Sequence, residues 1–275
     1  MTGPSRETLE GCVRAKLAKK PLALMAHAVA GYPSLEANRR MLLAMEEAGV
    51  DLVELQMPFS EPIADGPLFL KANQAAIEDG LTWSAYFELA RWASRSCSFP
   101  VLFMGYANSV FRMGEEAFCD RLVEAGLRGF ILADLPCEEA ANLHRRARER
   151  GLDPILIVTP TSSPERLAKI AAEASGFLYC VARKGVTGKR TDLSRGVAEF
   201  IARVRGSTKL PLGLGFGLKT PEDVASIRGL ADIAIVGTAC LEAWEEEGET
   251  GYREFLSGLV AATLGKAGRP PRSPG

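Results

Sequence analysis

The sequence lacks the features that mark membrane, secreted and nucleic-acid-binding proteins. It has no run of about 18 apolar residues, and its first 20 residues have mixed charge and no apolar segment. Basic and acidic residues nearly balance, 33 against 34, so no net field would attract nucleic acid or an anionic membrane. We therefore expect a cytoplasmic protein with no nucleic-acid or membrane partner.

Cysteine and histidine are also sparse. His27 and His144 are the only histidines, which makes a histidine-dependent triad or a multi-histidine metal site hard to build, and we expect no metal. The cysteines form no CxxC pair, so neither a zinc site nor a disulfide framework is indicated, and buried thiols are the simpler interpretation. The six cysteines are Cys12, Cys97, Cys119, Cys137, Cys180 and Cys240.

What the sequence does contain is a repeating pattern of strands and helices. Short runs rich in Val, Ile and Leu recur about every 25 to 30 residues, and segments with helical spacing of apolar residues follow them, as in a parallel sheet. The predicted strands span 23–29, 51–55, 100–104, 129–133, 154–158, 176–181, 211–215 and 232–237. Predicted helices include 34–49, 115–126, 137–151, 163–175 and 220–229.

Eight such units in a chain of 275 residues favour a (β/α)8 TIM barrel. An open doubly wound sheet usually has fewer strands and often a GxGxxG after the first, which is absent here. The length alone would also permit two domains, but we expect a single barrel over 1–264 and a frayed tail over 265–275. The amphipathic residues 6–18 predict an extra N-terminal helix over the N-terminal face of the barrel.

Glu54 and Asp65 lie at and just after the C-terminal end of the second predicted strand, and the active sites of such barrels lie at the C-terminal ends of the strands. Alternation turns one of two neighbouring side chains inward, and an inward Glu54 would be partly removed from water, as suits an acid/base catalyst. A pairing of Glu54 with a core Arg or Lys is the alternative. Asp65 follows in a proline-containing loop that could hold it over the barrel mouth, although a turn-forming or helix-capping Asp65 fits the pattern as well.

Glycines mark the ends of the last two strands. LGFG at 214–217 and IVGT at 235–238 each precede a possible helix start, where Gly215, Gly217 and Gly237 would let backbone N–H groups approach a phosphate. RKGVTGKRTD at 183–192, with Thr187 and Gly188 at its centre, has the composition of a lid after the sixth strand. An ordinary solvated loop is the alternative for that segment.

Together these motifs resemble the α subunit of tryptophan synthase over about residues 8 to 264. PFSEPIADGP, YANSVF, ADLP, GVTG, GFG and the VGT at 236–238 follow in the order and spacing of that family. The resemblance implies cleavage of indole-3-glycerol phosphate to indole and glyceraldehyde 3-phosphate without metal or Schiff base. It implies that Glu54 is the acid/base and that Asp65 holds the indole N–H. The other substrate-binding positions that it implies are Tyr106, Tyr179, Thr187, Gly188, Gly215, Phe216, Gly217, Gly237 and Thr238.

The resemblance also implies a partner. This would be a β subunit that carries pyridoxal phosphate, in an αββα heterotetramer, whereas the α chain itself needs no cofactor. The implied contact residues are Pro58, Glu61, Pro62, Asn108 and Phe111. Phe111 is the best anchor candidate, with a place in the ordinary core as the alternative.

Four residues depart from the family pattern. Gln56 replaces a glycine beside the active site, and Glu61 replaces an aspartate in the partner-facing loop. Tyr32 replaces an aspartate after the first strand, and His27 occupies a position that is commonly aromatic or apolar. Cleavage should survive because both carboxylates are kept, while coupling to the partner is less secure. The competing hypotheses are a stand-alone lyase that releases free indole, a catalytically silent regulatory subunit and another phosphosugar barrel.

Overall fold

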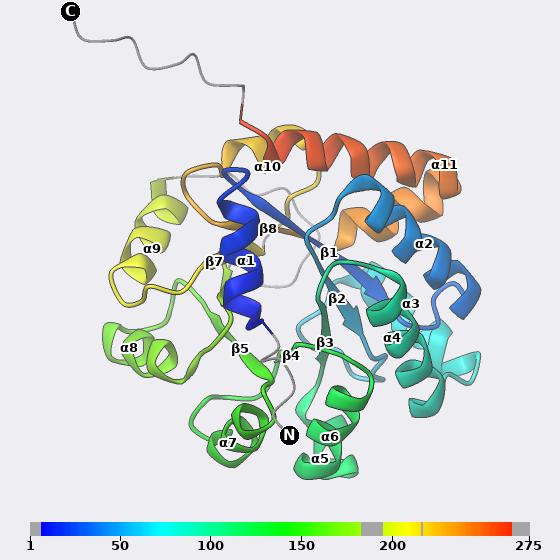
Figure 1. Ribbon diagram of the computed structural model, residues 1–275, viewed down its shortest axis with the longest axis horizontal. Helices are drawn as coiled ribbons and strands as arrows, with labels where there is room; N and C mark the ends of the chain where they lie inside the picture. The colour runs from blue at the N-terminus through cyan, green and yellow to red at the C-terminus, as the bar shows by residue number, and fades with distance from the viewer. Residues whose placement is uncertain (1–6, 183–194, 216, 266–275) are drawn as a thin grey trace, which may run out of the picture.

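Eight parallel strands close into a barrel in chain order from β1 to β8 (Figure 1). The computed structural model describes residues 7–182, 195–215 and 217–265. The predicted TIM barrel is confirmed, and each predicted strand is found to within about two residues at either end. The strands are β1 (Ala23–Val29), β2 (Leu52–Gln56), β3 (Val101–Gly105), β4 (Gly129–Leu132), β5 (Asp153–Val158), β6 (Leu178–Val181), β7 (Leu212–Gly215) and β8 (Ile233–Val236).

Helices surround the barrel, and local sequence signals account for several of their ends. Ser34, Thr82, Ser163 and Thr220 accept hydrogen bonds from backbone N–H groups of the first turns that follow them. Gly49 ends α2 in the left-handed conformation, at φ 86°. The helices are α1 (Leu9–Leu17), α2 (Leu35–Ala48), α3 (Pro67–Glu78), α4 (Trp83–Ser96), α5 (Ala107–Met113), α6 (Glu115–Glu124), α7 (Ala141–Glu149), α8 (Pro164–Glu173), α9 (Arg195–Arg205), α10 (Pro221–Ser226) and α11 (Thr238–Thr263), the last broken at Gly248.

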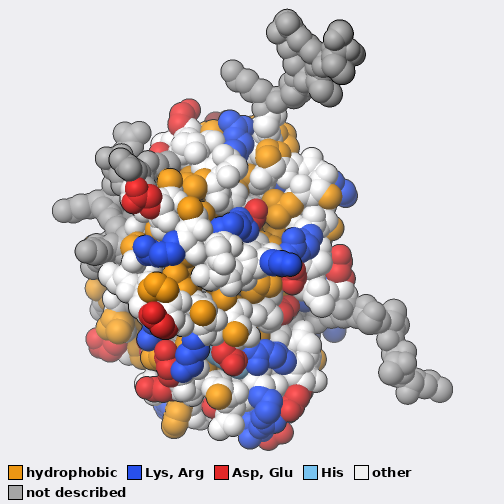
Figure 2. Space-filling model, turned by 90° about the vertical axis from the view of Figure 1, so that its left-hand side faces the viewer, with side chains coloured by type: hydrophobic (Ala, Val, Ile, Leu, Met, Phe, Trp, Pro, Cys, Tyr) orange, Lys and Arg blue, Asp and Glu red, His pale blue; other side chains and the backbone are white. Residues whose placement is uncertain are grey.

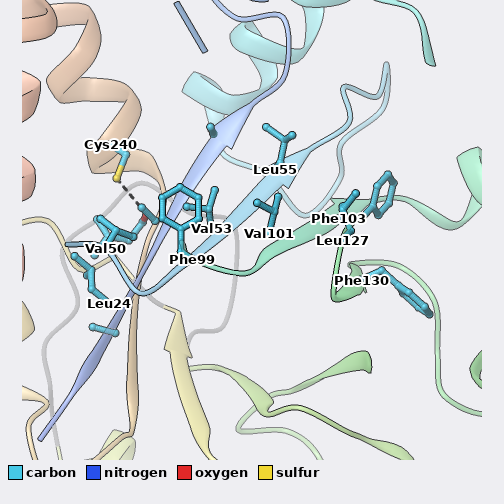
Figure 3. Packing of buried hydrophobic residues seen from close by; sticks show 14 of the residues in the cluster. Leu24, Val50, Val53, Leu55, Phe99, Val101, Phe103, Leu127, Phe130 and Cys240 are labelled. Atoms are coloured by element: carbon cyan, nitrogen blue, oxygen red, sulfur yellow. Dashed lines mark hydrogen bonds between the residues drawn. The ribbon is translucent and has the colours of Figure 1, made fainter. Parts of the chain in front are cut away.

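Alternation along the strands separates an outer core from the barrel interior. On β2 the outward-facing Val53 and Leu55 pack in the large cluster between strands and helices, where Figure 3 shows them with Val101 and Phe103 of β3. Leu52, in the same strand, belongs instead to the interior cluster. The positions between and beyond the outward residues, Glu54 and Gln56, therefore point into the barrel.

Apolar side chains fill the N-terminal half of the interior. Leu9 and Val13 of α1 join this cluster, and the backbone N–H of Leu9 donates to Asp153 Oδ2 at 3.2 Å, at the start of β5. Helix α1 thus closes the N-terminal end of the barrel, as the sequence predicted. The strand residues of this cluster are Ala23, Met25, Leu52, Leu102, Ile131, Ile155, Ile233 and Ile235, with Phe177 just before β6.

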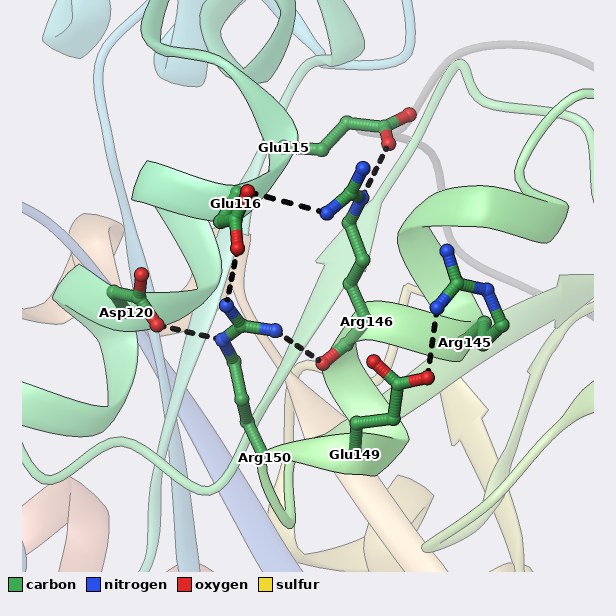
Figure 4. Close-up of polar contacts among 7 residues, drawn as sticks. All are labelled: Glu115, Glu116, Asp120, Arg145, Arg146, Glu149 and Arg150. Carbon is green, nitrogen blue, oxygen red and sulfur yellow. Dashed lines mark hydrogen bonds and ion pairs between the residues drawn. The ribbon is translucent and has the colours of Figure 1, made fainter.

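Charged side chains of both signs are interspersed on the surface (Figure 2). Between α6 and α7, Arg150 reaches Asp120 at 2.6 Å and Glu116 at 3.1 Å, and Arg146 reaches Glu116 at 3.3 Å (Figure 4). Solvent screens such pairs, so each stabilises the fold only weakly. Among the helices of the described ranges, none has both the length and the hydropathy that crossing a membrane requires.

Candidate active site

A cavity of about 320 Å³ opens at the C-terminal ends of the strands. Its walls come from inward-facing positions and from the loops that follow β2, β5, β7 and β8, so residues distant in sequence meet in one place. The volume suits a small organic substrate. The residues that line it are His27, Glu54, Ala64, Asp65, Phe69, Met104, Ile131, Ala133, Ile157, Thr159, Tyr179, Val181, Gly215, Gly217, Leu218, Lys219, Ile235, Gly237 and Thr238.

Glu54 lies on the wall of this cavity and is only 3% exposed. Strand β1 pairs with β2 so that His27 stands directly beside it, and His27 Nδ1 lies 2.8 Å from Glu54 Oε1. The partner of Glu54 is therefore a histidine and not the core Arg or Lys considered as an alternative.

Asp65 faces the same cavity from the loop after β2. Gln56 Nε2 donates to Asp65 Oδ2 at 2.8 Å, which ties the loop to the end of the strand. Burial raises the pKa of the Asp65 carboxyl above its usual value, against the hydrogen bond from Gln56, which lowers it. The structure thus brings together the two carboxylates that the sequence singled out.

The two tyrosines occupy different places. Tyr179 lines the cavity from β6, and burial raises the pKa of its hydroxyl well above the usual value, with Glu54 and Asp65 acting in the same direction. Tyr106 is only 1% exposed and is not among the cavity-lining residues. Its hydroxyl accepts a hydrogen bond from the backbone N–H of Ala64 at 3.3 Å, and its ring stacks on Phe59 at 4.9 Å. In this structure Tyr106 supports the loop that carries Asp65.

The part of the wall at the ends of β7 and β8 has the glycine-lined character that the sequence suggested. A Cβ at Gly215 would stand 2.3 Å from Tyr179 Cε1, so only glycine leaves the ring in place. Gly217 has φ +59°, which favours glycine, and Gly237 directly precedes Thr238, the first residue of α11. A helix start that faces the cavity supplies free N–H groups and the positive end of the helix dipole. The predicted positions Thr187, Gly188 and Phe216 lie outside the described residues.

His27, Phe69 and Lys219 are among the cavity residues that were not singled out as binding positions from the sequence. His27 was noted only as a departure, and nothing in the pattern of strand β1 showed that it faces Glu54. The ring of Phe69, in α3, contacts His27 edge to face at 4.6 Å. Lys219 comes two residues after the glycine turn, and this proximity was the available signal. Its Nζ donates to Glu242 at 2.7 and 2.9 Å.

The residues expected at a partner contact differ in exposure. Pro58 and Pro62 are buried within the loop, while Glu61 and Asn108 are exposed. Phe111 is 85% exposed, so it does not belong to the core. An aromatic side chain this open to water is a candidate for contact with another protein.

Neither metal ligation nor disulfide bonding is indicated in the described residues. No group of three His, Cys, Asp or Glu side chains in these ranges could hold a metal ion. All six cysteines are free; four are buried and Cys12 and Cys97 partly so. Burial raises the pKa of the Cys180 and Cys240 thiols to about 12, which makes them unreactive at neutral pH.

Comparison with known proteins agrees with this geometry. The family model described as tryptophan synthase alpha chain matches residues 13–261. The tryptophan synthase alpha chain of Syntrophotalea carbinolica is 45% identical over 251 residues, covering 91% of this chain and 99% of that protein. That of Desulforapulum autotrophicum is 43% identical over 252 residues, with coverage of 92% and 100%. A chain in a structure of Mycobacterium tuberculosis tryptophan synthase superposes with a TM-score of 0.88 at 33% identity, covering 94% of this chain and 100% of that one. The chain therefore belongs to the tryptophan synthase alpha chain family.

Proposed function

We propose that Glu54 and Asp65 carry out the reaction of this chain, the cleavage of indole-3-glycerol phosphate to indole and glyceraldehyde 3-phosphate in tryptophan biosynthesis. The observation that carries the assignment is that both carboxylates line one cavity whose wall also includes a glycine-lined helix start. A substrate with an aromatic ring at one end and a phosphate at the other matches these two parts of the wall.

The reaction needs one proton to move between two atoms of the substrate. Glu54, as the acid, donates a proton to C3 of the indole, and the ring becomes a cation. The resulting carboxylate removes the proton of the side-chain hydroxyl, whose O–H electron pair becomes the C=O bond of the aldehyde. The electron pair of the broken carbon–carbon bond returns to the ring, and Glu54 ends protonated as it began.

Asp65 acts on the charge that develops in this step. As a carboxylate beside the indole N–H, it accepts a hydrogen bond that strengthens when the ring is positive, so it stabilises the transition state more than the substrate. The partly buried hydrogen bond from Gln56 orients it.

The phosphate would lie against Gly217, Gly237 and Thr238. Backbone N–H groups at the start of α11 and the Thr238 hydroxyl are the donors available there. Lys219 contributes a cation to the same wall, with Glu242 holding its ammonium group. No cofactor takes part in this scheme, because each proton transfer is made by a side chain of the protein.

We further propose that the chain works in the cytoplasm with a β subunit that carries pyridoxal phosphate, in an αββα assembly. The exposed Phe111 supports this, and it lies on α5 near a surface hollow lined in part by Pro58, Asn108 and Arg112. Release of indole, measured with and without added β subunit, separates this assembly from a stand-alone lyase: a subunit gains activity on mixing and a stand-alone enzyme does not.

Replacement of the acid tests the central assignment. Glu54→Gln should lower kcat for indole release by about 10²–10⁴-fold, the usual contribution of an acid/base group. Glu36→Gln, which removes a carboxylate that is 71% exposed on α2, is the matched control and should leave kcat unchanged. Unchanged turnover in a folded Glu54→Gln variant would refute the assignment.

A further inference from the structure

Two buried polar side chains of the cavity region take no part in the proton transfers of the two-carboxylate mechanism. His27 is 4% exposed and Gln56 is fully buried, and both point into the barrel from β1 and β2. Burying such groups is costly unless they are hydrogen-bonded, so their partners are informative.

The hydrogen-bond partners fix the orientation of Gln56. Asn73 Oδ1 accepts from the backbone N–H of Phe59 at 2.9 Å, and Asn73 Nδ2 donates to the carbonyl of Phe69 at 2.7 Å. Because a backbone N–H only donates and a carbonyl only accepts, the amide of Asn73 has one possible orientation. Gln56 lies 3.3 Å from Asn73 Oδ1 and 2.8 Å from Asp65 Oδ2, and these two acceptors require its NH2 group. The oxygen of Gln56 therefore faces His27.

This orientation in turn fixes the tautomer of His27. Gln56 Oε1 lies 2.8 Å from His27 Nε2, so Nε2 carries a hydrogen. The other ring nitrogen, Nδ1, lies 2.8 Å from Glu54 Oε1. A hydrogen bond between them requires one proton, which resides either on Nδ1, giving imidazolium and carboxylate, or on Glu54, giving neutral imidazole and carboxylic acid.

We infer that His27 is a positioning residue for Glu54: it keeps the single proton that cleavage requires shared between its own Nδ1 and Glu54. Gln56 makes this sharing possible, because it selects the tautomer of His27 in which Nε2 carries the other hydrogen. The inference rests on the proposed function of Glu54. An isolated carboxylic acid at neutral pH loses its proton to water, whereas in the pair the proton on Nδ1 passes back to Glu54 Oε1 before Glu54 donates it to the substrate. After the hydroxyl proton has been taken up, the pair again holds one proton.

The electrostatic surroundings support this arrangement. Burial lowers the pKa of His27, but the Glu54 carboxylate and its hydrogen bond act in the opposite direction, and the net pKa is raised above its usual value. Among the described residues, the titratable groups around His27 are Glu54 from β2, Asp65 from the following loop and the Cys240 thiol from α11, with Tyr179 across the cavity. The two carboxylates both favour the protonated form of the His27 ring.

The test begins with the imidazole itself, in the absence of substrate. His144 is the only other histidine and lies in α7 outside the cavity, so His144→Gln leaves one ring to observe. In this variant, ¹⁵N NMR should show Nε2 protonated throughout the titration and Nδ1 losing its proton only above the ordinary value of 6.5. A neutral ring with hydrogen on Nδ1, or a pKa below 6.5, would overturn the inference even if the chain cleaves the substrate.

Kinetics then separate proton storage from structural support. His27→Asn keeps a neutral donor near the Nδ1 position but cannot hold an extra proton. The pH at which kcat/KM begins to fall on the alkaline side should therefore be lower in the variant by about one pH unit. Relative to the parent, the variant should lose about tenfold more kcat/KM at pH 8 than at pH 6. Parallel profiles for the variant and the parent would refute the role. Absence of cleavage in the parent would instead refute the proposed function, which the NMR titration does not use.

Discussion

Gly215→Ala is the substitution for which the geometry makes the sharpest prediction. The new Cβ would lie 2.3 Å from Cε1 and 2.6 Å from the hydroxyl oxygen of Tyr179, where ordinary contact begins at 3.4 Å. Gly215 lies between two paired strands, beside Val181 of β6 and Ile235 of β8, so the backbone has little freedom to withdraw. The tyrosine ring must therefore move by about 1 Å or more into the cavity, since interiors are packed without spare room.

The size of the effect follows from the cost of overpacking. An extra methyl group in a well-packed site costs about 1–3 kcal/mol. If the displaced ring weakens substrate binding by this amount, KM for indole-3-glycerol phosphate rises about 5- to 150-fold. If the strain destabilises the folded protein instead, the free energy of unfolding decreases by the same amount.

Both outcomes are measurable, by steady-state indole release and by denaturant unfolding. Gly258→Ala is the matched control, because its Cβ would meet only Pro221 Cγ, at 3.4 Å, within the regular part of α11. There alanine should be neutral or stabilising by up to about 1 kcal/mol, as the better helix former. If Gly215→Ala leaves both KM and stability at parental values, the argument from close packing is wrong.

Two further predictions concern other parts of the chain. Burial lowers the pKa of His144 to about 4, so its neutral ring stabilises the fold above the unfolded value of 6.5, and this stability is lost as the pH falls through 4. Unfolding of His144→Gln, followed from pH 7 to pH 4, should therefore depend less on pH than that of the parent, and identical dependence would contradict the assignment. Phe111→Ala should weaken activation by the β subunit at least tenfold while leaving basal indole release unchanged, because Phe111 is exposed and is not among the cavity-lining residues. Equal activation of variant and parent in a titration with β subunit would exclude Phe111 as an anchor.

The strands could be predicted from the sequence because each is a short, largely apolar run that begins shortly after a glycine or a proline. The exception at one boundary has a local cause. Strand β6 was expected from residue 176 but begins at Leu178, because Gly176 has φ +74° and the N–H of Phe177 bonds back to Ser175. Helix α7 was expected from residue 137 but begins at Ala141, because the preceding residues form hydrogen-bonded turns.

The sequence predicted those residues of the candidate site that the pattern at the end of a single strand is enough to identify. Glu54 follows from alternation on β2, and the glycines at the ends of β7 and β8 follow from the need for close backbone approach. The contacts of His27, Gln56 and Asn73 could not be predicted in this way. They depend on the register between neighbouring strands, which decides which residues lie side by side, and the sequence of one strand does not show that register.

A buried carboxylate at the other end of β2 supplies that register. Asp51 is 3% exposed; its Oδ2 accepts from the N–H of Leu24 at 2.8 Å, and its own N–H donates to the carbonyl of Leu24 at 2.9 Å. Lys20 Nζ lies 2.5 Å from the same carboxylate, so its buried charge is paired. These bonds hold β2 against β1 in one register, and three residues further along that register sets Glu54 beside His27. A slip of one residue would turn Glu54 away from its partner, because side chains alternate between the two faces of a strand. Hence Asp51, which directly precedes β2, serves the site by fixing the register of the strand, and this leaves Glu54, within β2, in place for the chemistry.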